Sequence, residues 1–276
     1  MASNVELDAQ RTADEATLRQ MGEIERSVKE SPMVGDATVV DVLRPDYADT
    51  SSPGFLPGIA YLACKYATLR RVRGDGNCFY RSLLFAYLET LVAGLAAALP
   101  GSSEELLRVR GVVAASKDTL RDVGYEEFAT EDFFDAFTGL LETVPSLTSA
   151  SLHLLFSEGG EADSFTWYMR LLTAAHLRQH ADRFFPFLDG VDSDMASYCR
   201  REVEPMGRES DQLHIIALSE YLGIPLQIEY LDGREFDPLV GLSCIQFPDS
   251  QESSSPLGTV HVTLLYRPGH YDILYL

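Results

Sequence analysis

One cysteine of this sequence stands where a reactive thiol would be useful. Residues 74–80 read GDGNCFY, a glycine-rich turn followed by a helical pattern. Cys78 then occupies the first turn of that helix, where the partial positive charge of the helix end favours thiolate over thiol. Gly76 and Asn77 belong to the same turn, whose backbone N–H groups can hold the oxyanion of an acyl-transfer intermediate. The arrangement suits a nucleophile, although a cysteine at a helix start can also serve only as a small apolar side chain.

A nucleophilic cysteine needs a base, and His270 is the histidine best placed to be one. It follows an R-P-G turn and begins the last predicted strand, HYDILYL. Side chains two residues apart share one face of a strand, so Asp272 lies on the same face as His270. A carboxylate there can fix the tautomer of the imidazole and stabilise the imidazolium. The alternative is a solvent-facing H-x-D pair, and it has to be weighed together with Cys78.

The other five histidines have no such companion. His176 and His180 are four residues apart on one predicted helix, a spacing that can bind metal, but no third ligand is evident. His214 falls in an apolar helix, where a hydrogen-bonded core histidine is expected, and His153 and His261 have no polar neighbour of note. The four cysteines form no C-x-x-C pair and no regular framework, so neither a metal site nor a disulfide scaffold is predicted.

The elements around these residues predict an α+β domain with a mostly antiparallel sheet. LRRVR leads as a strand into the GDGNC loop, and apolar residues then recur every four positions from Phe79 to Leu91 as a buried helix. Further helices are expected after this one. A capping box that begins at Ser102 marks the start of the first of them, and Ser210 is the expected N-cap of the last. These helices cover about 102–123, 130–141, 148–157, 162–180, 193–203 and 210–222. Four later segments alternate with period two and predict strands at 226–231, 243–247, 260–266 and 270–276.

The N-terminal sixty residues are expected to lie outside the core. Four apolar residues recur there at helical spacing, namely Leu18, Met21, Ile24 and Val28. They predict a narrow amphipathic arm over residues 1–34 that binds a partner, with a disordered tail as the alternative. Residues 35–58 are interrupted by proline, glycine and serine and are expected to form a lead-in loop. One packed domain is then predicted over 59–276.

Composition excludes several classes of function. The 42 acidic and 22 basic side chains leave a net charge of −20, which opposes a phosphate backbone and favours a partner with a basic face. The first residues, MASNVELDAQ, contain no apolar signal core, and the strongly apolar stretch at 91–100 is too short to span a bilayer. We therefore expect a soluble protein of the cytoplasm or the nucleus that binds neither nucleic acid nor membrane.

Four motifs together resemble the otubains, a branch of the ovarian-tumour family of cysteine deubiquitinases. They are GDGNCFYRS at 74–82, EVEPM at 202–206, HIIAL at 214–218 and LLYRPGHYDILY at 264–275. The resemblance implies a papain-like fold in which a helical subdomain packs on the sheet. It also implies hydrolysis of the isopeptide bond between a ubiquitin C-terminus and a lysine, without metal or organic cofactor.

The same resemblance assigns roles to individual residues. It implies that Cys78 is the nucleophile and His270 the general base and acid. Asp75 and Asp272 compete for the aspartate that orients the imidazole, and the strand-face argument favours Asp272 and leaves Asp75 to hold the loop. Ubiquitin and polyubiquitin chains are the implied partners. The alternative function is non-catalytic binding of ubiquitin-charged conjugating enzymes through the N-terminal arm, whereas a general papain-type peptidase is disfavoured because C-G-[SA]-C-[WY] is absent.

Overall fold

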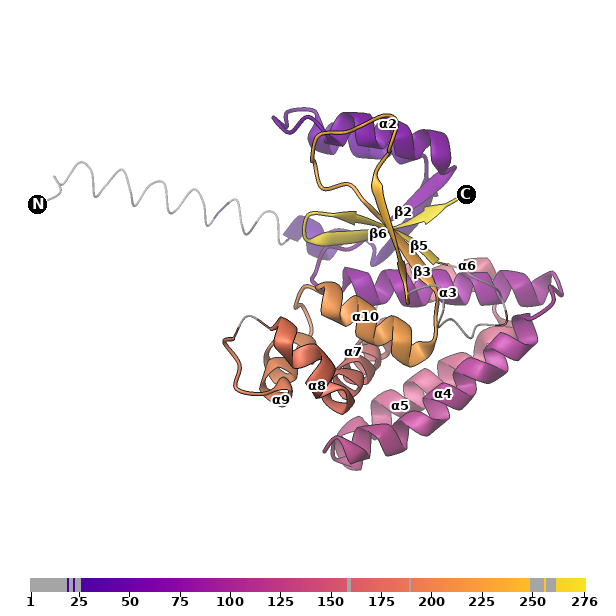
Figure 1. The fold of residues 1–276 in the computed structure, drawn as a ribbon. Coiled ribbons are helices and arrows are strands. Elements are labelled where there is room, and N and C mark those ends of the chain that lie inside the picture. Colours follow the sequence, from indigo (N-terminus) through magenta and orange to yellow (C-terminus); the bar gives the residue numbers. More distant parts are fainter. Residues whose placement is uncertain are drawn as a thin grey trace, which may run out of the picture.

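A six-stranded mixed sheet forms the centre of the protein (Figure 1). The computed structural model describes residues 19, 22, 26–157, 160–188, 190–248, 256 and 262–276. Across the sheet the strands are β1 (Val34–Thr38), β2 (Thr68–Val72), β6 (His270–Tyr275), β5 (Val262–Arg267), β3 (Leu226–Tyr230) and β4 (Ser243–Phe247). All neighbouring strands are antiparallel except β3 and β5, which are parallel. The predicted α+β class with a mostly antiparallel sheet is confirmed.

Helices cover both faces of this sheet. Figure 1 shows α2 (Phe55–Lys65) on one side and α3 (Cys78–Ala96) with the remaining helices on the other. The predicted helical segments are confirmed as α4 (Ser102–Asp122), α5 (Glu127–Thr143), α6 (Ser149–Ser157), α7 (Glu161–Gln179) and α10 (Gln212–Leu222). The segment predicted at 193–203 is α-helical only in α9 (Met195–Tyr198), and the short helix α8 (Ala181–Phe184) was not predicted. Short 3-10 helices lie at η1 (Val40–Tyr47), η2 (Val144–Ser146) and η3 (Phe185–Phe187), and a π-helical turn lies at η4 (Cys199–Val203).

The helix α3 is the central core element. It is apolar on nearly all sides, and the sheet, α4, α6 and α7 surround it, so that it packs on every face as a fully buried helix does. By length and composition alone it would also qualify as a membrane span, but most of its residues are buried inside the protein. A helix this rigidly embedded provides a fixed position for Cys78 at its first residue.

The prediction that residues 35–58 are a lead-in loop and that the core begins near Ile59 was wrong. Strand β1 pairs with β2, with Val34 opposite Val72, and Val40 and Leu43 are buried against α2. The packed chain therefore begins at Met33. A five-residue edge strand followed by a 3-10 turn is too short to show either apolar period, so the local sequence resembles a loop.

Two predicted helix caps were also wrong. Gly101, not Ser102, is the N-cap of α4, and the Glu105 carboxylate is buried in contact with Arg108 and Tyr87 instead of reaching back to the cap. In α10 the cap is Asp211, one residue after the expected Ser210. Its carboxylate accepts hydrogen bonds from the first turn of the helix, where a negative charge also offsets the helix dipole.

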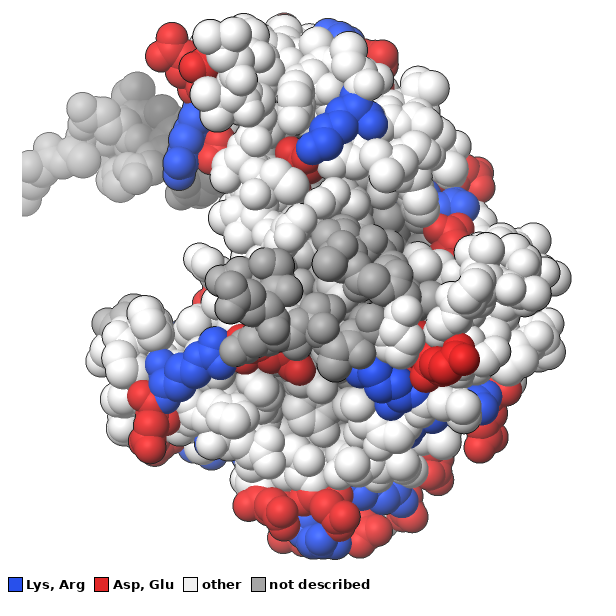
Figure 2. All heavy atoms as spheres, turned by 45° about the vertical axis from the view of Figure 1, so that its right-hand side comes forward, with Lys and Arg blue, Asp and Glu red and all other residues white. Residues whose placement is uncertain are grey.

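The net charge of −20 is unevenly distributed over the surface. Figure 2 shows basic and acidic side chains interspersed over much of one face, and at its lower end several acidic side chains lie beside basic ones. The α4–α5 hairpin ends there, and its exposed carboxylates include Asp118, Asp122, Glu126 and Glu127. This end of the helical half is suited to a basic partner surface.

Candidate active site

The starts of α3 and β6 meet at the predicted catalytic residues. The ring of Phe79, next to Cys78, packs edge-on against Tyr271, next to His270, with the ring centres 5.5 Å apart. The Nε2 atom of His270 lies 2.9 Å from Oδ1 of Asp272, as the shared strand face predicts. Cys78 lies close enough to the same imidazole to be among the groups that raise the pKa of His270. Three side chains that the sequence places in two distant segments thus form one contiguous cysteine, histidine and aspartate site.

The two ring nitrogens of His270 face different partners. Nε2 is engaged by Asp272, and Nδ1 faces the loop that precedes α3, because a Cβ atom added at Gly74 would lie 3.3 Å from it. Only a glycine leaves this space open beside the imidazole. The geometry leaves Nδ1 for proton exchange with Cys78 and with a group bound beside it.

Asp272 is a fully buried carboxylate with several donors around it. Its Oδ1 accepts the backbone N–H of Val72 at 3.0 Å, and its Oδ2 accepts Nε and Nη2 of Arg267 at 3.0 and 2.7 Å. Burial alone would raise the pKa of Asp272, but the hydrogen bond from His270, the charges of His270 and Arg267 and the Val72 amide together lower it. The carboxylate is therefore ionised and fixed in orientation.

The imidazole of His270 is correspondingly basic. Burial acts to lower its pKa, but hydrogen bonds and charge from Asp272 and Cys78 outweigh burial and raise the pKa to about 9. At neutral pH the ring is an imidazolium between an aspartate and a cysteine. A cation beside a thiol at a helix start is the environment in which a thiolate is favoured.

Asp75, the competing aspartate, lies in the loop and not against His270. Its carboxylate makes a bidentate ion pair with Arg81, both N–O distances being 3.0 Å, and it accepts the backbone N–H of Asn77 at 3.1 Å. Arg81 is completely buried. The Asn77 amide is thus occupied by Asp75, whereas Cys78, the first residue of α3, has a backbone N–H with no partner inside the helix.

Gly76 allows the loop to approach a distant segment very closely. Its φ is +77°, and an added Cβ would lie 2.1 Å from the carbonyl oxygen of Gly207. The side-chain oxygen of Asn77 accepts the backbone N–H of that same Gly207 at 3.0 Å. Gly76 and Asn77 therefore hold the loop in place against residues that follow the EVEPM motif.

Sequence analysis missed Arg170, a buried residue that holds this loop in place by hydrogen bonds. Its guanidinium is fully buried and donates to Oδ1 of Asn77 at 2.8 Å, to the carbonyl of Gly76 at 2.7 Å and to the carbonyls of Val203 and Arg208 at 2.9 and 2.7 Å. One signal was present in the sequence, because an arginine interrupts the apolar run WYMRLLTAA of a buried helix. Only the folded chain shows what it bonds.

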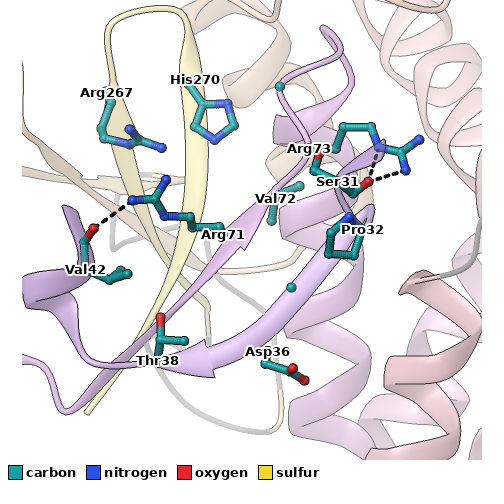
Figure 3. Close-up of a pocket in the computed structure, with 12 residues that line it drawn as sticks. Ser31, Pro32, Asp36, Thr38, Val42, Arg71, Val72, Arg73, Arg267 and His270 are labelled. Carbon is teal, nitrogen blue, oxygen red and sulfur yellow. Dashed lines mark hydrogen bonds between the residues drawn. The ribbon is translucent and has the colours of Figure 1, made fainter. Parts of the chain in front are cut away.

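Two pockets flank the strand that carries His270. A cavity of about 420 Å³, here called the basic pocket, is lined by Ser31, Pro32, Gly35, Asp36, Thr38, Val42, Arg71, Val72, Arg73, Gly74, Arg267 and His270 (Figure 3). A second cavity of about 500 Å³, here called the acidic pocket, is lined by Glu209, Ser210, Asp211, Gln212, Ile215, Tyr230, Asp232, Arg234, Tyr266, Gly269 and Tyr271. One pocket with mainly basic charged side chains and one with mainly acidic charged side chains therefore lie beside the site.

The remaining candidates lie apart from this site. His214 is a buried histidine hydrogen-bonded to Tyr198, and His176 contacts Glu220 at 3.1 Å. Among the described residues no group of three or more histidine, cysteine, aspartate or glutamate side chains is placed to hold a metal ion. His261, Leu18, Met21 and Ile24 lie outside the described residues, whereas Val28 is half-buried in a helical turn at residues 26–30.

The other cysteines differ from Cys78 in their surroundings. All four thiols are free. Burial raises the pKa of Cys199 to about 12 and that of Cys244 to about 11, which makes both poor nucleophiles. Cys64 is exposed on α2, away from any histidine contact that the structure shows. Among the described residues, Cys78 is the cysteine that raises the pKa of a histidine.

Comparison with known proteins agrees with this geometry. The family described as Peptidase C65 Otubain matches residues 26–276. The chain belongs to the otubain family. Ubiquitin thioesterase OTUB1 of Rattus norvegicus is 38% identical to this otubain over 267 residues, which are 95% of this chain and 90% of the relative. An ovarian tumor domain-containing deubiquitinating enzyme of Arabidopsis thaliana is 36% identical over 266 residues, which are 91% of this chain and 83% of the relative.

A solved structure extends the similarity to three dimensions. It is described as a ceOTUB1 ubiquitin aldehyde UBC13~Ub complex, and it matches this otubain with a TM-score of 0.80 and 31% identity over 93% of this chain and 98% of that one. The predicted otubain fold is confirmed. The roles that sequence analysis assigned to Cys78, His270, Asp272 and Asp75 remain predictions, now attached to definite positions.

Proposed function

We propose that this otubain is a cysteine deubiquitinase that hydrolyses the isopeptide bond between the C-terminus of ubiquitin and a lysine. The observation that carries the proposal is His270, held between Asp272 at 2.9 Å and Cys78, in a chain 38% identical to a ubiquitin thioesterase. The similarity to these relatives extends along nearly the whole chain, and it includes both segments that form the site.

In the first half of the reaction the enzyme is acylated. The Cys78 thiolate attacks the carbonyl carbon of the last ubiquitin glycine, and the N–H groups at the start of α3 stabilise the oxyanion. The imidazolium of His270 gives its Nδ1 proton to the departing lysine amine, and the C–N bond breaks. A thioester between Cys78 and ubiquitin remains, and His270 is left neutral.

The second half returns the enzyme to its starting state. Neutral His270 takes a proton from a water molecule, which attacks the thioester carbonyl, and the C–S bond breaks. Free ubiquitin is released as the carboxylic acid, which gives its proton to solvent, and the Cys78 thiolate and the His270 imidazolium are restored. Asp272 holds the imidazole in one orientation throughout, since its carboxylate is fixed by Arg267 and the Val72 amide. No step requires a metal or an organic cofactor.

The acidic pocket supports ubiquitin as the acyl donor. It contains Gly269 and Tyr271, the two neighbours of His270, and the carboxylates of Glu209, Asp211 and Asp232. The C-terminal tail of ubiquitin contains arginines and ends in two glycines, so carboxylates beside the narrow end of the site would attract it. Ubiquitin aldehyde is present in the solved complex that resembles this chain.

The decisive experiment compares the intact protein with Cys78→Ala on the full set of homotypic di-ubiquitins. We expect the parent to cleave at least one linkage and Cys78→Ala to cleave none, because within the described part of the chain no other cysteine contacts a histidine. Cys64→Ala, which removes an exposed thiol on α2, is the matched control and keeps parental activity. Cleavage by purified Cys78→Ala, or labelling of another cysteine by a ubiquitin with a C-terminal electrophile, would refute the mechanism.

A second candidate function is binding of ubiquitin-conjugating enzymes. The solved structures that resemble the chain include complexes with UBC13 and UBCH5B conjugates of ubiquitin. The helical half exposes large aromatic side chains where α5 begins and where η3 ends, Phe128 being 93% and Phe187 72% exposed. Exposed aromatics of this size are typical of protein interaction sites. The apolar stripe of Leu18, Met21, Ile24 and Val28 remains a predicted contact for the same partner or for a second ubiquitin.

Binding is tested separately from catalysis. Phe128→Asp and Phe187→Asp should each weaken the affinity for a ubiquitin-charged conjugating enzyme about tenfold, measured by calorimetry, since one large buried aromatic contributes roughly 1.5–3 kcal/mol. Leu239→Asp is the control, because Leu239 is 96% exposed in the loop between β3 and β4. Equal affinities for all three variants and the parent would exclude this surface.

A further inference from the structure

The basic pocket concentrates positive charge in an otherwise acidic protein. Figure 3 shows Arg71 and Arg267 on the same side as His270, with Arg73 turned toward Ser31. Arg71 and Arg267 share the carboxylate of Asp46, at 2.9 and 3.4 Å, and Arg267 also binds Asp272. These contacts place two arginines within one hydrogen-bonded group at the base of the pocket.

Arg73 is the cation that this group does not neutralise. Its Nε and Nη2 atoms donate to the backbone carbonyl of Ser31, and no carboxylate of the described chain lies within ion-pair distance of it. Asp36 is the one carboxylate among the twelve lining residues, and it is 90% exposed and lies 3.8 Å from His153. Asp46 and Asp272 pair with Arg71, Arg267 and His270, whereas Arg73 has no carboxylate partner among the described residues.

The chemistry assigns the pocket to one side of the scissile bond. The general acid must reach the leaving amine, so the leaving group lies beside the imidazole edge that is not held by Asp272. The basic pocket contains His270 together with Gly74, which faces Nδ1. The acidic pocket lies on the other side of the same strand and suits the ubiquitin tail. The basic pocket is therefore on the side of the lysine and of the protein that carries it.

We propose that the basic pocket binds an acidic side chain of the protein that carries the scissile lysine, and so favours lysines with a neighbouring glutamate or aspartate. The inference rests on the proposed isopeptidase activity and adds a preference to it. A cavity of about 420 Å³ admits one such side chain beside the lysine. Arg73 supplies the charge, and its planar guanidinium, held by Ser31, presents its remaining N–H groups to a carboxylate.

The test uses ubiquitin joined through a native isopeptide bond to the lysine of two synthetic peptides. The peptides are identical except that glutamates flank the lysine in one and glutamines in the other. We expect kcat/KM of the intact protein to be about fivefold higher for the glutamate peptide, the upper range for a partly exposed ion pair. Raising the salt concentration to 0.5 M should reduce the ratio, because screening weakens such pairs.

Variants locate the source of the preference. Arg73→Gln should bring the ratio of the two kcat/KM values to about one, and because both values come from the same variant, a general loss of activity cancels. Arg73→Lys keeps the charge and should retain most of the preference. Arg121→Gln, which removes an exposed arginine on α4, is the matched control and keeps both the ratio and the activity of the parent.

Each outcome separates the inference from the function on which it rests. A ratio of one in the parent, or an undiminished ratio in Arg73→Gln, would overturn the acidic-side-chain proposal while leaving the isopeptidase intact. If the parent cleaves neither conjugate nor a fluorogenic amide of the ubiquitin C-terminus, the proposed function itself fails. If Arg73→Gln does not fold, the parental ratio and its loss at high salt still decide the question.

Discussion

The two halves of the active site are held in place by different means. In the β6 half, His270 and Asp272 are two residues apart, and the alternation of a single strand puts them on one face. In the α3 half, Gly76 and Asn77 are held by Arg170, which is 93 residues from Asn77 along the chain. One half is organised locally, and the other depends on contacts between distant segments.

This difference predicts different responses to mutation. Changes in the β6 half alter charge and proton transfer, because the strand keeps its shape without them. Changes in the α3 half alter the position of the loop before α3, because the conformation of this loop depends on its glycines and on its contact with the buried guanidinium of Arg170. In the first half, activity should therefore fall by more than the loss of stability explains, whereas in the second half the two should fall together.

The largest effect is expected from Asp272→Asn. Asparagine cannot stabilise the imidazolium and can hold the ring in the wrong tautomer, so kcat on di-ubiquitin should fall on the order of a thousandfold. Asp75→Asn is the comparison, because Asp75 contacts Arg81 and the Asn77 amide and not His270. Its loss of activity should be smaller and should accompany a lower melting temperature. Equal losses for the two variants would show that the two aspartates share one role.

Gly76→Ala should lower activity about a hundredfold, because it displaces the loop that precedes Cys78. A Cβ atom would lie 2.1 Å from the carbonyl oxygen of Gly207, and the φ of +77° disfavours alanine. We expect a loss of several kcal/mol in the free energy of unfolding, measured with urea. Gly111→Ala, in α4 with nothing near the added atom, is the matched control and should gain about 0.5–1 kcal/mol. Unchanged stability of Gly76→Ala would mean that the two loops separate easily.

Arg170→Lys should lower kcat about tenfold and also destabilise the fold. A lysine keeps the charge but cannot reach Asn77, Gly76, Val203 and Arg208 together, so several buried oxygens lose their donor, each costing about 1–3 kcal/mol. Activity on a fluorogenic ubiquitin amide and the melting temperature give the two readouts. A variant with parental stability and lower activity would assign Arg170 an electrostatic part in the reaction.

The smallest expected effect is the pH dependence of the stability that His270 contributes. Its pKa is raised from 6.5 to about 9 in the folded protein, so the stability it contributes is complete below pH 6.5 and is lost as the pH rises through 9. The difference in free energy of unfolding between the parent and His270→Gln should shrink by at most about 3 kcal/mol from pH 6 to pH 9.5. Activity should fall over the same alkaline range as the imidazolium deprotonates. A difference that grows with pH would contradict the ion pair.

Local sequence patterns were sufficient to predict much of the structure of this protein. The position of Cys78 at a helix start, the pairing of His270 with Asp272 and the bounds of most helices follow from short-range rules, because a helix start, a strand face and an apolar period are each properties of a few neighbouring residues. The predicted class of fold follows from the order of helices and strands in the same way.

Only the tertiary structure decided the rest. It moved the start of the packed chain from Ile59 back to Met33, since an edge strand is recognised by its partner and not by its own residues. It gave Arg170 its role at the nucleophile loop, and it assembled the basic pocket from residues of β1, β2 and β6. Buried polar groups choose partners by proximity in the folded chain, and that proximity is set by long-range packing that no local window of sequence contains.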